Sequence, residues 1–203
     1  MIGGSFSYSR TTNIIMGYSL QDASTKVNEG KIGNLHLFET YALSAFFSKD
    51  VVKWWTLSLS VTGYYFKYTG SLGGIDFTRS APSGYGNISN IINLPKGFKA
   101  EISGVYVSPW LSGSNKTKSR WGANFSIKRS FLKDKLNVSA GINDIFYTLG
   151  LRTINYIPGQ TFNVNVTLDT RRFTVGATYT FGKIKIEQRN IKGNGEDKKR
   201  LGH

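Results

Sequence analysis

The chain has 203 residues, 39% of them hydrophobic, and a formal net charge of +14. It has no cysteine, which excludes disulfides and thiolate metal sites. No run of about 18 apolar residues occurs, so we expect no transmembrane helix. Residues 1–5 lack the basic and apolar regions of a signal peptide, so we expect either a cytoplasmic protein or a piece of a longer one.

Hydrophobic alternation with a period of two predicts an all-β antiparallel meander of eight long strands. In chain order the strands cover about residues 5–19, 34–48, 52–68, 84–94, 98–110, 118–132, 135–168 with a break at 149–159, and 171–182. Segments rich in Gly, Pro, Asn and Asp separate them, as expected for turns and loops.

The two faces of each predicted strand are unlike those of a soluble protein. In the strand at 52–68, Leu59 and Val61 lie on one face, and Ser60 and Thr62 lie on the other. A soluble barrel or sandwich would place Lys and Glu on its outer face, whereas these polar faces carry mostly uncharged Ser, Thr, Asn and Gly. The pattern favours a transmembrane β-barrel with an apolar outer face and a hydrated lumen.

The predicted connections alternate in length. Short turns are expected at 49–51, 95–97 and 133–134, and longer connections at 20–33, 69–83, 111–117 and 148–160. Outer-membrane barrels have short periplasmic turns and longer outer loops. The alternation therefore predicts that both ends of the chain lie on the periplasmic side.

The positions of charged and aromatic residues fit this interpretation. Glu39, Lys67 and Arg129 lie on apolar faces near strand ends, away from mid-span, where a lipid-facing cation costs about 2–4 kcal/mol. Aromatic residues gather near both ends of the strands, which predicts two girdles at the membrane interfaces. The girdle residues are Trp54, Trp55 and Phe131 near the short turns, Tyr65, Tyr68, Tyr106 and Trp110 near the long loops, and Trp121.

The last strand precedes a basic tail. Residues 183–203 carry seven Lys or Arg against three Asp or Glu, and they include no aromatic residue. A nucleic-acid stacking platform would interleave aromatics with the charges, so we expect no nucleic-acid partner. We divide the chain into a barrel segment, 1–182, and a flexible periplasmic tail, 183–203, which has too few apolar residues to order itself.

Several short motifs resemble TonB-dependent receptors. Residues 143–146 (Asn-Asp-Ile-Phe) resemble their Asn-x-(Leu/Ile)-Phe segment, and residues 179–182 (Tyr-Thr-Phe-Gly) resemble their last strand. Residues 53–55, 96–98 and 195–201 are similar to the Bacteroidota branch of that family. The resemblance covers most of the chain.

The resemblance implies a 22-stranded outer-membrane barrel with an N-terminal plug, of which this chain would be the last eight strands. It implies TonB-dependent uptake of a substrate, with TonB engaged through an N-terminal region that this chain lacks. The other implied partners are outer-membrane lipid and the barrel assembly machinery, which reads a C-terminal strand ending in aromatics, here Tyr179 and Phe181.

Two other interpretations stay open. A self-contained eight-stranded barrel, acting as an anchor or adhesion protein, predicts that the strand near residues 6–14 pairs with the strand near 173–181. A basic soluble β protein that binds nucleic acid predicts solubility without detergent. Because two histidines and no cysteine supply neither a nucleophile–base pair nor a metal-ligand set, we expect no enzyme activity and no cofactor.

Overall fold

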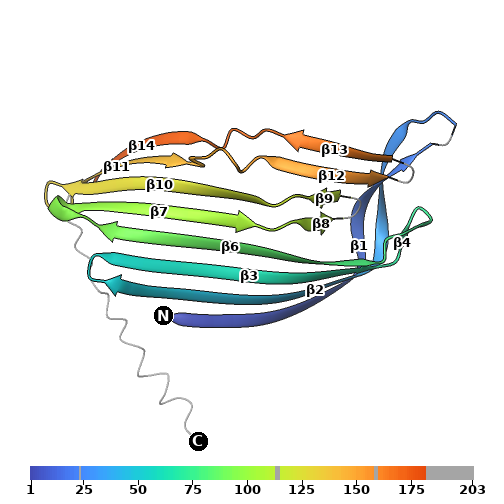
Figure 1. Ribbon diagram of the computed structural model, residues 1–203, viewed down its shortest axis with the longest axis horizontal. Coiled ribbons are helices and arrows are strands. Elements are labelled where there is room, and N and C mark those ends of the chain that lie inside the picture. Colours follow the sequence, from blue (N-terminus) through green and yellow to red (C-terminus); the bar gives the residue numbers. More distant parts are fainter. Residues whose placement is uncertain (23, 113–114, 158–159, 182–203) are drawn as a thin grey trace, which may run out of the picture.

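The computed structural model describes residues 1–22, 24–112, 115–157 and 160–181, and it is built almost entirely of antiparallel strands (Figure 1). The main sheet has eight strands that pair in the order β1-β2-β3-β6-β7-β10-β11-β14. Their bounds are β1 (Ile2–Gln21), β2 (Asn28–Val52), β3 (Trp55–Thr69), β6 (Arg79–Asn93), β7 (Phe98–Val107), β10 (Arg120–Phe131), β11 (Leu136–Asn143) and β14 (Arg172–Tyr179). The predicted meander is therefore confirmed.

A second sheet of four short strands extends one end of the main sheet. It comprises β8 (Trp110–Ser112), β9 (Asn115–Thr117), β12 (Leu151–Ile157) and β13 (Gln160–Val166), in the order β13-β12-β9-β8. Each continues a strand of the main sheet towards the end with the long connections (Figure 1). β4 (Ser71–Leu72) and β5 (Ile75–Asp76) form a small hairpin, and η1 (Pro95–Gly97) is a single 3₁₀ turn.

Five predicted boundaries are wrong. The loop predicted at 111–117 holds β8 and β9, and the loop predicted at 69–83 holds the β4–β5 hairpin and the first residues of β6. The first short turn lies at 53–54 rather than 49–51, because β2 stays paired with β3 through Asp50 and Thr56. The loop predicted at 20–33 shrinks to 22–27, since Gln21 pairs with Asn28 across a long β1–β2 hairpin. The break predicted at 149–159 holds β12, and the segment after it forms β13 of the second sheet rather than a resumed long strand.

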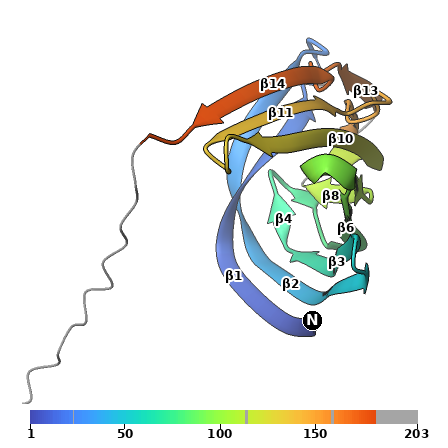
Figure 2. The same ribbon diagram turned by 90° about the vertical axis from the view of Figure 1, so that its left-hand side faces the viewer.

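The main sheet curls around a concave side. Figure 2 shows β1, β3, β6, β10 and β14 following an arc, with β4 inside it. β1 pairs only with β2, and β14 pairs only with β11, within the ranges that the structure describes. The β1–β14 pairing that a self-contained eight-stranded barrel predicts is therefore not found, and both outer edges of the sheet carry unpaired backbone groups.

Little of the chain is packed as a hydrophobic core. A cluster of five buried side chains lies at the long-connection end, where the β4–β5 hairpin meets the sheet: Met16, Leu35, Tyr68, Leu72 and Phe77. Gly73 approaches Tyr18 so closely that an added Cβ would lie 2.6 Å from its ring, and its φ of +58° favours glycine. None of the helices described is long and apolar enough to cross a membrane.

Candidate transmembrane surface and lumen

The faces of the main sheet are inverted relative to a soluble protein. On β3, Leu59 and Val61 are 42% and 46% exposed, whereas Ser60 and Thr62 between and beside them are half-buried. On β7, Ile102 is likewise exposed at 47%. A soluble protein seldom exposes a continuous apolar surface of this size. The convex face therefore has the chemistry of a surface that contacts lipid acyl chains.

The concave face is held by a ladder of small polar side chains. The hydroxyls of Ser44 and Thr62 lie 2.9 Å apart across β2 and β3, and Ser48 and Ser58 repeat this contact at 2.9 Å. Further along the sheet the Ser89 hydroxyl donates to Glu101 Oε1 at 2.9 Å. Uncharged hydroxyls satisfied across strands are suited to a water-filled interior rather than to a packed one.

The length of the apolar face matches a bilayer. Tyr65 lies ten positions after Trp55 on β3. At a rise of about 3.4 Å per residue, this corresponds to about 34 Å along the strand. A strand tilted by about 40° then spans about 26 Å across the membrane, close to the ~25 Å apolar band of outer-membrane barrels.

Three predicted girdle residues lie at the short-turn end. Trp54 is 53% exposed, and Trp55 is half-buried and donates from Nε1 to Asn90 Oδ1 at 3.0 Å. Phe131 is 38% exposed and packs under the Arg129 guanidinium, which lies 4.7 Å from its ring centroid. An aromatic ring shields Arg129 in this way on an otherwise apolar face.

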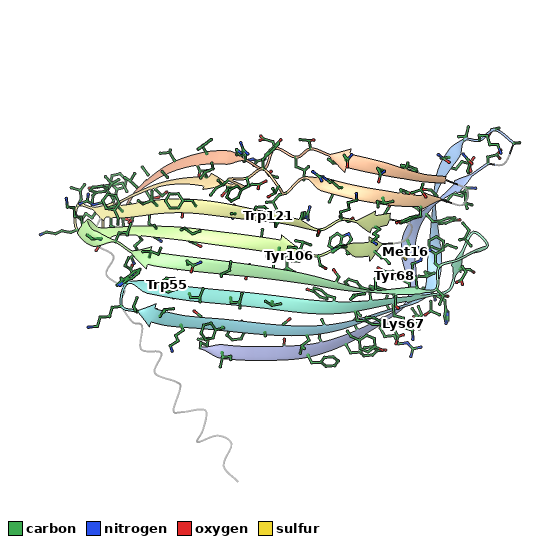
Figure 3. All side chains as sticks on the ribbon, in the orientation of Figure 1. Met16, Trp55, Lys67, Tyr68, Tyr106 and Trp121 are labelled. Atoms are coloured by element: carbon green, nitrogen blue, oxygen red, sulfur yellow. The ribbon has the colours of Figure 1, made fainter. Side chains whose placement is uncertain are left out.

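Four more girdle residues lie further along the strands. Tyr106 and Trp121 are paired across β7 and β10 and are 50% and 47% exposed (Figure 3). Tyr65 donates from its hydroxyl to Ser80 Oγ at 2.8 Å, and Trp110 is 42% exposed on β8. Their exposed positions are compatible with an outer girdle, which stays a prediction.

The assignment of Tyr68 to the girdle is wrong. Tyr68 is only 7% exposed, because β3 places it on the same face as Thr62 and Ser60, and its hydroxyl donates to the Leu111 carbonyl at 3.0 Å. Alternation along β3 turns residue 68 to the face opposite Tyr65. Tyr68 belongs to the buried cluster on the concave side.

Glu39 and Lys67, which were expected near the ends of their strands, form an ion pair with each other. Lys67 Nζ lies 3.3 Å from Glu39 Oε2 across β2 and β3, and the Tyr8 hydroxyl donates to Glu39 Oε1 at 2.8 Å. Both residues lie at the long-connection end of the sheet, where Figure 3 places Lys67. The pair neutralises charge on the apolar face where three strands meet.

Asp144 stabilises the segment between β11 and β12 by accepting several hydrogen bonds. The sequence alone gave this residue no role of its own. Its side chain is fully buried and accepts hydrogen bonds from the Thr170 hydroxyl at 2.6 Å and from the backbone amides of Thr148 and Leu149 at 2.9 and 3.0 Å. Leu149 packs over Gly122, where an added Cβ would lie 2.7 Å away. The signal in the sequence was a carboxylate directly after an alternating strand, within the motif at 143–146.

Two carboxylates shape the loops at the long-connection end. Asp22 accepts hydrogen bonds from the Ser24 hydroxyl at 2.6 Å and from the Thr25 amide at 2.7 Å, and these bonds hold its pKa well below its usual value. The backbone amide of Thr78 lowers the pKa of Asp76 in the same way, at 2.8 Å. Among the described residues no three His, Cys, Asp or Glu side chains gather as metal ligands.

The predicted assembly signal lies on an exposed strand. Tyr179 and Phe181 are 43% and 83% exposed, and their rings meet edge to face at 4.7 Å. Their role in assembly stays a prediction. The predicted tail at 183–203 lies outside the described residues.

Comparison with known proteins agrees with the inverted faces and the antiparallel sheet. Residues 3–179 match a family described as "Outer membrane protein beta-barrel family". Searches of curated proteins and of solved structures found no match. The matched residues include every strand of the main sheet except the first residue of β1. The chain therefore belongs to the outer membrane protein β-barrel family and is a component of the bacterial outer membrane.

Proposed function

We propose that this chain forms the last eight strands of a larger, TonB-dependent receptor barrel that takes up a substrate across the outer membrane. The observation that carries the proposal is the pair of unpaired edges at β1 and β14. Backbone groups left without partners in hydrocarbon cost several kcal/mol each, so an open sheet is not viable in lipid. Further strands pairing with both edges would remove that cost.

The side chains of the concave face also favour a larger barrel. A closed barrel of eight strands is only wide enough for its interior to be filled by side chains or one small ligand. Here many interior side chains at mid-sheet are small and polar, such as Ser44, Thr62 and Ser103, and a hollow of about 460 Å³ remains on the concave side although Phe46 and Tyr85 also line it. A wider barrel with a plug or water inside would suit them better.

Disulfide trapping tests the edges, because the chain has no cysteine of its own. Cysteine pairs would be placed at Ser7, Ser9 or Thr11 of β1 against Thr174 or Gly176 of β14, in the full-length protein expressed in cells. Ser44→Cys with Thr62→Cys is the positive control, since these residues are directly opposed. We expect the control alone to form a bond within the chain. A β1–β14 bond would favour the self-contained barrel instead.

Energy coupling needs a separate test, because it rests on the resemblance of residues 143–146 and 179–182. The full-length protein would be cross-linked in living cells and recovered with antibody against TonB. We expect a TonB adduct that is lost when the region preceding this chain is deleted. An intact, correctly inserted barrel without any TonB adduct would refute uptake by this mechanism while leaving the barrel interpretation untouched.

A further inference from the structure

A cavity of about 850 Å³ lies at the junction between the main sheet and the second sheet. Three cations line it, Lys118, Arg120 and Arg152, together with Trp121 and the amides Asn163 and Asn165. No Asp or Glu is among its lining residues. Its volume is within the range of about 300–1,000 Å³ that is typical of small-ligand sites.

None of the three cations forms an ion pair with another residue that the structure describes. The ion pairs of the described chain are Lys31 with Glu29 and Lys67 with Glu39, and neither is at the cavity. The fully buried carboxylate nearby, Asp144, already accepts hydrogen bonds from Thr170, Thr148 and Leu149. Three like charges around one cavity repel one another, and an anion bound between them would remove that repulsion.

Backbone hydrogen bonds set the positions of the segments that carry these residues. The Lys118 amide donates to the Arg152 carbonyl at 2.8 Å, which sets the two cations on neighbouring segments of backbone. Arg120 and Trp121 are consecutive on β10, and the Thr148 hydroxyl donates to the Trp121 carbonyl. The backbone at the break in the sheet therefore sets where the three cations lie, with Arg120 half-buried and Lys118 and Arg152 exposed.

The chemistry of the lining selects one class of ligand. Arginine guanidinium groups bind phosphate oxygens through paired, charge-assisted hydrogen bonds. The side-chain amides of Asn163 and Asn165 can donate hydrogen bonds to hydroxyl groups and accept them. We infer that the cavity binds a ligand bearing phosphate groups, with Arg120 and Arg152 contacting the phosphate.

Two sources could supply this chemistry at the cell surface. One is a phosphorylated lipid of the surrounding membrane, and the other is a soluble phosphorylated solute that reaches the barrel from outside. The inference does not depend on TonB, because it concerns only the charges and the cavity. A failure of the uptake proposal would therefore leave it standing.

The test uses the full-length protein purified in detergent. Its binding to inorganic phosphate, and separately to lipid A presented in mixed micelles, is measured by calorimetry at low and high salt. The variant Arg120→Gln/Arg152→Gln is compared with Lys49→Gln/Lys53→Gln, which removes the same charge at the opposite end of the sheet. Heat-modifiable gel mobility shows whether each variant is folded.

We expect saturable binding of at least one probe, weakened by salt. Each arginine lost should reduce affinity by about tenfold, while the control should bind as the unmodified protein does. Binding of lipid A alone would assign the site to membrane lipid, and binding of inorganic phosphate would assign it to a soluble ligand. The inference is overturned if neither probe binds, or if the folded cavity variant binds as tightly as the control.

Discussion

Placing an arginine on the convex face is the most direct test of whether that face contacts lipid. Val61 is 46% exposed and lies on β3 between Trp55 and Tyr65, near the middle of the estimated membrane span. A lipid-facing Arg at the bilayer midplane costs about 2–4 kcal/mol. Since each 1.4 kcal/mol is about a factor of ten, the folding equilibrium should shift by about thirty- to a thousandfold.

The matched control lies one residue away. Ser60 faces the concave side, so Ser60→Arg introduces the same side chain into a hydrated environment. Reversible unfolding of the full-length protein from lipid vesicles by guanidinium, followed by tryptophan fluorescence, gives both free energies of unfolding. We expect Val61→Arg to be the more destabilising by at least about 2 kcal/mol. The opposite order would show that the convex face does not contact lipid.

Three further perturbations follow from individual contacts. Asp144→Ala leaves two backbone amides and a hydroxyl without acceptors, so it should lower the unfolding free energy by about 3 kcal/mol or more in the same assay, and Asp144→Asn by less. Asp22→Ala should increase trypsin cleavage at the lysine of the β1–β2 turn, because the turn loses the hydrogen bonds that Asp22 accepts. The Asp22 carboxylate stabilises the turn only when it is ionised, and its pKa is lowered. The unmodified turn should therefore resist cleavage equally at about pH 8 and pH 5. Tyr179→Ser with Phe181→Ser should deplete the full-length protein from the outer membrane, while deletion of 183–203 should leave it inserted; the reverse result would exchange their roles.

The strands of the main sheet were predictable because one physical signal defines them. A strand between lipid and water alternates apolar and polar residues throughout its length, as Leu59, Ser60 and Val61 do. The second sheet was not predicted, because its strands lie beyond the part of the sheet that separates lipid from water. β12 and β9 are stabilised by pairing with each other, through contacts such as Thr117 with Thr153, and local alternation does not reveal such pairing.

The candidate sites differ in the same way. The exposure of aromatics such as Tyr106 and Trp121 could be predicted from their place near strand ends, whereas proximity to a strand end does not show which face Tyr68 occupies. The basic cavity could not be predicted from the sequence. Lys118 and Arg152 are separated by more than thirty residues, and the pairing of β9 with β12 brings their segments together.

The small core indicates where the stability of this fold must come from. Six hydrophobic side chains are buried among the residues described, while the large apolar side chains of the convex face stay exposed. Apolar surface contributes to stability only when it leaves water, at about 25 cal/mol per Å². For this sheet that transfer takes place on entering the membrane rather than on folding in water. Because strands can enter lipid only with their edges paired, insertion and closure must occur together, and the isolated sheet should aggregate in buffer through β1, β14 and the convex face.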